Sequence, residues 1–241
     1  MAQRPIFIPS KDSISLVDEI SVPLTWHSGF APVQKQKNIT DLHASARIRG
    51  LWPILEVSTK SFDQVGQRLS AFNLKTSLGE ICLPIEVAFQ GSKVFEFGGP
   101  FTDLYFADPR AAKKDERLKS SGKLVGFKFG EFTFPIRPVT AFYDWLYLNA
   151  IYPHREWLAR LERYVGFTDI EFNPEKSVNC QARSCALFFS LLNKGLLDRA
   201  LTGPEQFLEI LHEFSYMPEL PTGIREPNSE LGSQQASFAL R

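Results

Sequence analysis

The sequence lacks an excess of charge of either sign, and this absence disfavours one class of function. Lysine plus arginine and aspartate plus glutamate each total 27 among 241 residues, so the formal net charge is zero. A protein that coats DNA regardless of sequence relies on a strongly positive surface. An enzyme that acts on one modified nucleotide needs only a basic rim around its pocket, so local contacts with DNA remain compatible with this composition.

Cysteines are also few, and long hydrophobic runs are missing. Cys82, Cys180 and Cys185 show no C-x-x-C spacing, and four scattered histidines supply no obvious partners, so we predict no structural metal and no cofactor. No apolar run reaches the roughly 18 residues that a membrane span requires, and no secretory leader precedes Pro5. We therefore expect a soluble, cytoplasmic protein without membrane contacts.

Apolar residues make up 44% of the chain, which is enough for a folded core. Prolines set off short strands at 6–8 and 20–25, and a helix is expected over 39–48 with Asn38 as its cap. A buried strand over 53–58 precedes a second possible cap, Asp63. The start of the chain is therefore predicted to be rich in β-structure.

The second half of the chain favours helices. Phenylalanines alternate with polar or small residues between 124 and 136, which predicts a hairpin that turns at Gly130 and Glu131. The charged segment 108–123 indicates solvated surface, and helical patterns follow it at 139–150, 155–165, 178–193 and 204–214. We predict one α+β, mainly α-helical domain over residues 1–218, with a β-rich extension over about 1–50 and a loosely held tail at 219–241.

The stretch 69–95 places a carboxylate and an amine on one predicted helical face. Pro84 suits the first turn of a helix, and the glycines and proline at 98–100 would end it. Along such a helix Glu86, Gln90 and Lys93 share a stripe about 10 Å long, which could bracket one sugar. The alternative is an exposed Glu/Lys pair on a helix surface.

This stretch resembles the signature of the NADAR family, an LSNF-like segment followed by S-V-E-x-x-F-Q-x-x-K. Here the two parts are residues 69–73 and 85–93, with Ala71 where Asn is usual and Ile85 where Val is common. A wider resemblance, from about residue 4 to 195, is to the NADAR antitoxins paired with DarT-type DNA ADP-ribosyltransferases. It rests on RPIFIPS, GFAPVQKQKNITDLH, EVSTKS, GSKVFEFGGPFTDLY, FYDWLY and FTDIEFNPEKSVNCQARS.

The resemblance implies a NADAR-like domain and hydrolysis of an N-glycosidic bond. For the DarT-associated branch the implied substrate is guanine in DNA that carries ADP-ribose on its exocyclic amine, and the product is ADP-ribose. The implied functional partner is a DarT-type toxin, whose modification would be reversed. Two alternatives are a NADAR N-glycosidase for small phosphoribosylamine intermediates of riboflavin synthesis, and a non-catalytic module that binds ADP-ribose or the toxin.

Breaking such a bond requires charge stabilisation at the anomeric carbon, a proton for the leaving amine and a nucleophile. Glu86 can stabilise the charge or hold a ribose hydroxyl. Lys93 could donate the proton as an ammonium or, with its pKa lowered by burial, attack the anomeric carbon and form an imine with the ring-opened sugar. We prefer the imine, and we expect Glu86, Lys93 and Asp169 to be catalytic.

Other polar residues are candidates for binding sugar, phosphate or base. Asp169 and Glu171 alternate with apolar residues, which predicts two carboxylates on one strand face and lets Asp169 orient the attacking group. Gly98 and Gly99 could admit a pyrophosphate or merely end a helix, and Asn173 or Ser177 could cap the helix at 178–193. The predicted ligand-binding residues are Ser70, Phe72, Asn73, Gln90, Gly98, Gly99, Asn173, Asn179 and Gln181.

The aromatic run 142–147 could stack a base. Phe142, Trp145 and Leu146 share one apolar helical face, however, so packing in the core is favoured. His27 and His43 have no carboxylate or cysteine partners at useful spacing, and we interpret both as structural or solvated.

Overall fold

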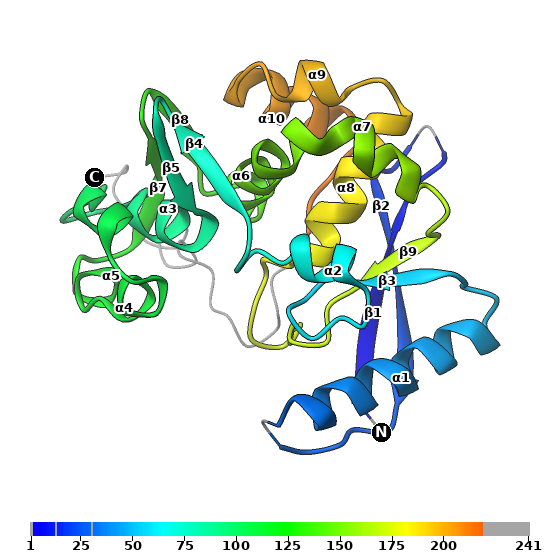
Figure 1. Cartoon of the computed structure of the whole chain (residues 1–241). Coiled ribbons are helices and arrows are strands. Elements are labelled where there is room, and N and C mark those ends of the chain that lie inside the picture. Colours follow the sequence, from blue (N-terminus) through cyan, green and yellow to red (C-terminus); the bar gives the residue numbers. More distant parts are fainter. Residues whose placement is uncertain (1, 13, 30, 219–241) are drawn as a thin grey trace, which may run out of the picture.

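A four-stranded sheet joins both halves of the chain. The computed structural model describes residues 2–12, 14–29 and 31–218, so the predicted tail at 219–241 lies outside the described residues. The strand order is β2 (Val17–Leu24), β1 (Ala2–Pro9), β9 (Gly166–Thr168) and β3 (Ile54–Glu56). β1 is antiparallel to β2 and β9, whereas β3 is parallel to β9. Strands far apart in the sequence are therefore neighbours in the sheet (Figure 1).

Two cores cover the two faces of this sheet, because successive strand residues point to opposite sides. Ile6 packs in a small core beneath α1 (Pro32–Ile48), with Ile39, Leu42 and Ala46 of that helix. The next residue, Phe7, belongs to the main core, where Phe167 stacks on Phe189 of α8 (Gln181–Asn193). Figure 1 shows α1 and α8 on opposite sides of the sheet.

The main core is built around α6 (Ala141–Ile151) and α8. Phe142, Trp145 and Leu146 are all buried, which confirms the prediction that this face of 142–147 packs inside. The predicted hairpin is also confirmed, since β7 (Leu124–Phe129) pairs with β8 (Phe132–Pro135), and β6 (Lys93–Phe95) joins its other edge. Aromatic side chains of this sheet pack on Phe142.

Shorter elements complete the fold, which is mixed α/β with more helix than strand, as predicted. They are α2 (Gln64–Arg68), β4 (Lys75–Leu78), β5 (Ile81–Pro84), α3 (Ile85–Gly91), η1 (Thr102–Phe106), α4 (Pro109–Lys114), α5 (Arg117–Ser120), η2 (Tyr152–His154), α7 (Arg155–Leu158), η3 (Ala159–Leu161), α9 (Leu197–Ala200) and α10 (Pro204–Glu213). In the part of the chain that the structure describes, no helix has the length and apolar character to cross a membrane.

Several predicted boundaries were wrong, for identifiable reasons. α1 begins at Pro32, so Asn38 is not a cap; it lies buried inside the helix, where its Oδ1 accepts from the His27 amide at 2.7 Å. The predicted helix 155–165 breaks into α7 and η3, and the helix predicted from 178 begins at Gln181. Asp63 is a cap as predicted, because its Oδ1 accepts from the Val65 amide at 2.8 Å.

Candidate functional site

The helix that carries Glu86 ends before Lys93, contrary to the prediction. α3 stops at Gly91, and Lys93 begins strand β6, where it pairs with Phe127. The end of α3 packs closely on η1, because a Cβ on Gly91 would lie 2.6 Å from the Tyr105 ring. Long-range pairing with β7 thus replaces the helix that local pattern favoured, and the glycines at 98–99 do not end it.

A hydrogen-bonded chain nevertheless joins the three predicted residues. Gln90 Nε2 donates to Glu86 Oε1 at 2.8 Å across one helical turn, and Lys93 Nζ donates to Gln90 Oε1 at 2.7 Å. Glu86 and Lys93 are half-buried and Gln90 is buried. The carboxylate, amide and amine therefore lie together, although the amine reaches the amide from a strand. The alternative of an exposed surface pair does not describe these residues.

Burial changes the acid–base behaviour of Lys93. It lowers the pKa of the amine to about 8, with Glu86 opposing the shift and Lys113 adding to it. Nζ also lies 4.9 Å from the centroid of the Phe89 ring, which packs against Phe127 and Tyr143. A fraction of this amine is neutral near pH 7.5, whereas an ordinary lysine with a pKa near 10.4 is almost fully protonated.

Asp169 lies just past the end of β9, so the predicted pairing of two carboxylates on a strand face was wrong. The chain turns there, and the Glu171 amide donates to Asp169 Oδ1 at 2.9 Å. Asp169 is consequently buried while Glu171 is exposed. Burial, and then the negative charge of Glu56, raises the pKa of Asp169 well above its ordinary value.

Tyr143 links the two parts of the site. Burial, and then charges on Cys180, Asp169 and Glu86, raises the pKa of its phenol well above the ordinary value. Its ring also makes an edge contact with Phe89, the residue beneath the Lys93 ammonium. Tyr143 is therefore a neutral phenol whose ring packs on the residue beneath Lys93. The sequence analysis included Tyr143 only within the aromatic run 142–147 that could stack a base, and did not predict its contact with Phe89.

Gln181 ties the segment 69–73 to this region. Its Oε1 accepts from the Ala71 amide at 2.7 Å and lies 3.4 Å from Ser70 Oγ, and a hydrogen bond from Gln181 to Asp169 partly offsets that acid's raised pKa. Gln181 thus connects Ser70 and Ala71 to Asp169, and the ligand-binding roles of Ser70 and Gln181 stay predictions. Phe72 and Asn73 are exposed, and the Asn73 side chain donates to Gln67 O at 2.7 Å.

The glycine pair at 98–99 supports the main chain of Lys93. Gly98 O accepts from the Phe95 amide at 2.7 Å. Gly99 has a φ of +89°, and a Cβ there would lie 2.3 Å from the carbonyl oxygen of Lys93. Glycine is therefore required at 99 by both backbone conformation and close approach.

Asn173 and Asn179 lie in the segment between Asp169 and α8. Asn173 Oδ1 accepts from the Glu175 amide at 3.1 Å, and Asn179 Oδ1 is buried without a hydrogen-bond partner among the described residues. No side chain caps α8, whose preceding residue is Cys180, so the alternative in which Asn173 or Ser177 caps this helix was wrong.

Glu56 is a buried carboxylate that the sequence reasoning missed. Its Oε1 accepts from Ser58 Oγ at 2.6 Å and from the Ile170 amide at 2.9 Å, while Oε2 accepts from Thr168 Oγ1 at 2.7 Å. These bonds hold the residues on both sides of Asp169. Burial raises the pKa of Glu56 to about 7. A signal was available, because Glu56 is an acidic residue inside the segment 53–58 that was predicted to be buried.

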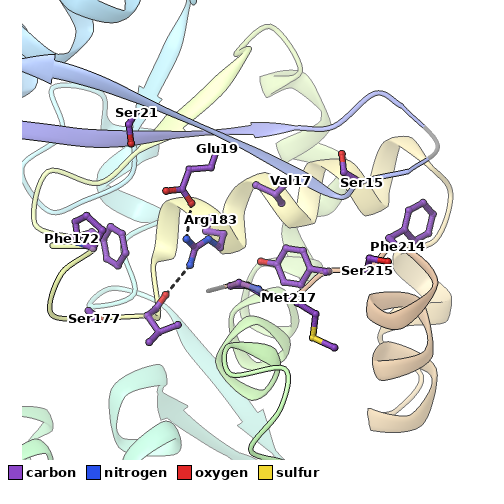
Figure 2. A pocket seen from close by; sticks show the side chains of 14 residues that line it. Ser15, Val17, Glu19, Ser21, Phe172, Ser177, Arg183, Phe214, Ser215 and Met217 are labelled. Carbon is purple, nitrogen blue, oxygen red and sulfur yellow. Dashed lines mark hydrogen bonds and ion pairs between the residues drawn. The ribbon is translucent and has the colours of Figure 1, made fainter. Parts of the chain in front are cut away.

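A cavity of about 700 Å³ lies between β2, the segment 172–178 and residues 214–218. Glu86, Lys93 and Asp169 do not line this cavity. Figure 2 shows Arg183 and Glu19 pointing toward one another at its wall. Arg183 donates to Glu19 Oε2 at 2.8 Å and to Val178 O at 2.9 Å, and its guanidinium lies 4.7 Å from the Phe7 ring centroid. Arg183 therefore connects the segment 172–178 to β2 through hydrogen bonds to both.

Fold and site together define a mixed α/β protein with a half-buried lysine joined to a glutamate and a buried aspartate supported by a second carboxylate. The family model that matches describes DarT1-associated NADAR antitoxins and covers residues 2–219, so the chain belongs to that family. A role in a toxin–antitoxin system with a DarT1 toxin follows from this membership. A search of curated proteins finds no match to the chain.

Proposed function

We propose that this antitoxin is an ADP-ribosylglycohydrolase that hydrolyses the N-glycosidic bond between ADP-ribose and guanine in DNA, and so reverses the modification made by its DarT-type toxin. The observation that carries the proposal is the Lys93 amine, half-buried, with a pKa near 8 and a hydrogen-bonded link to Glu86 through Gln90. A lysine of lowered pKa is a nucleophile suited to a sugar's anomeric carbon.

In the proposed reaction the neutral Nζ of Lys93 attacks the anomeric carbon, and the bond from that carbon to the guanine amine breaks. Glu86 stabilises the positive charge that develops on the sugar. The sugar ring then opens as its oxygen takes a proton from the new nitrogen, which leaves an imine. Water hydrolyses the imine, releases ADP-ribose and restores the amine of Lys93.

Asp169 supplies the proton that the guanine amine needs as it leaves. Its burial and the nearby negative charge of Glu56 favour the protonated carboxyl, which is the form that a general acid requires. Glu56 is a positioning residue in this scheme, since it holds Thr168 and Ile170 on either side of Asp169. Gln181 and Ser70 keep the segment 69–73 against the same acid.

The test is release of ADP-ribose from an oligonucleotide ADP-ribosylated on guanine, followed by mass spectrometry. Wild type should release it, whereas Lys93→Ala and Glu86→Ala should be slower by about a hundredfold or more. Lys119→Ala, which removes an exposed lysine, is the matched control. Binding without release by wild type would indicate a sequestering module, and neither binding nor release would redirect the work to small phosphoribosylamines.

A further inference from the structure

Aromatic side chains line a second cavity, which we call the Trp52 cavity. It has a volume of about 380 Å³, and its walls include Trp52, Phe62, Tyr164, His43 and Arg163. Trp52 is 48% exposed and Phe62 is 63% exposed. Large aromatic groups on a concave surface leave apolar area in water that a flat ligand would cover. Glu86 and Lys93 do not line this cavity, so it is separate from the proposed nucleophile.

Arginines accompany two of these rings. The Arg47 guanidinium lies 5.4 Å from the centroid of the Trp52 ring, and that of Arg163 lies 4.9 Å from the Tyr164 ring. Arg163 Nη2 also donates to the Tyr164 hydroxyl at 3.0 Å. Among the described residues no ion pair neutralises Arg47 or Arg163. Positive charge therefore stands beside aromatic faces, which is the combination that single-stranded nucleic acids require.

The two acidic residues that line the Trp52 cavity, Glu56 and Asp63, already accept hydrogen bonds from other protein groups. Asp63 caps α2 through the Val65 amide and accepts from the Tyr164 hydroxyl at 2.9 Å. Glu56 is buried and accepts the three hydrogen bonds described above. Both oxygens of Asp63 already accept hydrogen bonds and Glu56 is buried, so Arg47 and Arg163 are the charged groups beside the rings that can contact a phosphate.

Helix α1 extends this positive surface. Arg47 and Arg49, in the last turn of the helix and just after it, are exposed, because the buried face of α1 points to the sheet. Asp41, the acid of this helix, is held by His27 at 2.9 Å. A local excess of positive charge thus exists on a chain whose net charge is zero.

Two residues of the cavity wall connect it to the proposed site. His43 Nε2 lies 3.2 Å from Thr168 Oγ1, and Thr168 immediately precedes Asp169. Glu56, which also lines the cavity, accepts from Thr168 Oγ1 and from the Ile170 amide, so the cavity lies beside the segment that carries Asp169.

We propose that the Trp52 cavity stacks an unpaired nucleobase of a DNA strand, while Arg47 and Arg163 contact the flanking phosphates. This inference deepens the proposed function, because it takes DNA as the substrate and adds that the strand is bound single-stranded beside the modified guanine. Stacking on an aromatic face tolerates any base, so the cavity holds the strand without selecting its sequence.

The test measures binding of an unmodified, fluorescein-labelled single-stranded oligonucleotide by fluorescence anisotropy at low salt. Trp52→Ala should weaken binding about tenfold. Arg47→Gln should reduce the slope of log binding constant against log salt concentration by about one. Phe106→Ala removes a ring that is 75% exposed and outside the cavity, and it should bind like wild type. A matched duplex should bind more weakly than the single strand.

Equal binding by wild type, Trp52→Ala and Arg47→Gln would overturn the inference, and so would tighter binding of the duplex. Circular dichroism of each variant establishes that it is folded. If Trp52→Ala does not fold, Arg47→Gln still tests the inference, because Arg47 is exposed. Because the oligonucleotide carries no ADP-ribose, its binding is independent of catalysis. If the predicted oligonucleotide binding is absent but ADP-ribose is released, only the Trp52 inference is contradicted. If the binding is as predicted but no ADP-ribose is released, only the proposed glycohydrolase activity is contradicted.

Discussion

The amine of Lys93 depends on its surroundings for its chemistry. An ordinary lysine on a surface stays protonated at neutral pH, and its ammonium is no nucleophile. The half-buried position between Gln90 and the Phe89 ring removes water from this amine, and the opposing effect of Glu86 is smaller than the effect of burial. The same carboxylate that would stabilise the reacting sugar therefore limits how far the pKa of Lys93 falls.

The titration of Lys93 can be measured without any substrate. Acetylation of the amine, followed by peptide mass spectrometry, should be half-maximal near pH 8 and increase as the pH rises, because the neutral amine reacts. Glu86→Gln should move this midpoint down, and Lys113→Ala should move it up, since each removes the charge that opposes that change. The exposed Lys119 provides an internal reference. A Lys93 midpoint equal to that of Lys119 would contradict the burial argument.

Glu56 makes a prediction about stability. Its pKa in the folded protein is about 7, against an ordinary 4.5, so the folded state binds its proton more tightly than the unfolded chain does. The free energy of unfolding should consequently fall as the pH rises from about 4.5 to about 7, on the order of 3 kcal/mol. Urea denaturation at several pH values should show this slope in wild type and a shallower one in Glu56→Gln. Glu131→Gln, which changes an exposed carboxylate in the turn between β7 and β8, should retain the wild-type slope, and a Glu56→Gln slope equal to wild type would count against the assignment.

Sequence reasoning identified the reacting groups better than their neighbours. Glu86, Gln90 and Lys93 follow from a short signature, and the structure joins them by two hydrogen bonds. Tyr143 and Glu56 were missed because their positions depend on contacts between segments far apart in the chain. The burial of Glu56 indicates a role in the site only once its hydrogen-bond partners, Thr168 and Ile170, are known.

At the scale of elements, strand pairing decided the shape of the site. Local pattern favoured a helix from Pro84 to the glycines at 98–99, but β6 pairs with β7 from Lys93 onward. Periodicity within one segment carries no information about a partner strand some thirty residues later, so this boundary could not be predicted. The hairpin of β7 and β8 was predictable, because its turn and both strands are adjacent in sequence.

Gly99 tests how closely this element supports Lys93. Gly99→Ala should lower the free energy of unfolding by about 3 kcal/mol, from backbone strain and from the contact with the Lys93 carbonyl. Gly79→Ala is the matched control, because Gly79 has a φ of +58° and no atom within 4 Å of an added Cβ. It should cost about 1 kcal/mol. Chemical denaturation of both variants measures the difference, and equal losses would show that the close approach at Gly99 carries no energy.

At the scale of the whole molecule, the first strand supports the last segment of the site. β1 lies beside β9, whose end carries Asp169, and Phe7 is fully buried against Phe172 and Arg183. The sequence indicated a β-rich start but not which strands would be its neighbours. The family resemblance, by contrast, is confirmed by a match over residues 2–219, whereas the division at residue 218 stays a prediction.

Phe7→Ala should therefore affect both β1 and the segment around β9. Removing this buried ring should lower the free energy of unfolding by about 3–5 kcal/mol, and native-state hydrogen exchange should show faster exchange at residues 166–172 as well as in β1. Phe106→Ala, at an exposed ring, should change stability by less than about 0.5 kcal/mol. Faster exchange confined to β1 would mean that the two strands are not energetically coupled.

The most direct test of the account is to trap the sugar on Lys93. Wild-type protein is incubated with the oligonucleotide ADP-ribosylated on guanine, borohydride is added during turnover, and the protein is digested for mass spectrometry. The account predicts a reduced ADP-ribose adduct on the peptide that contains Lys93, together with unmodified oligonucleotide. Release of ADP-ribose with no adduct at any lysine would contradict the nucleophilic role of Lys93, and an intact modified oligonucleotide would contradict the glycohydrolase itself.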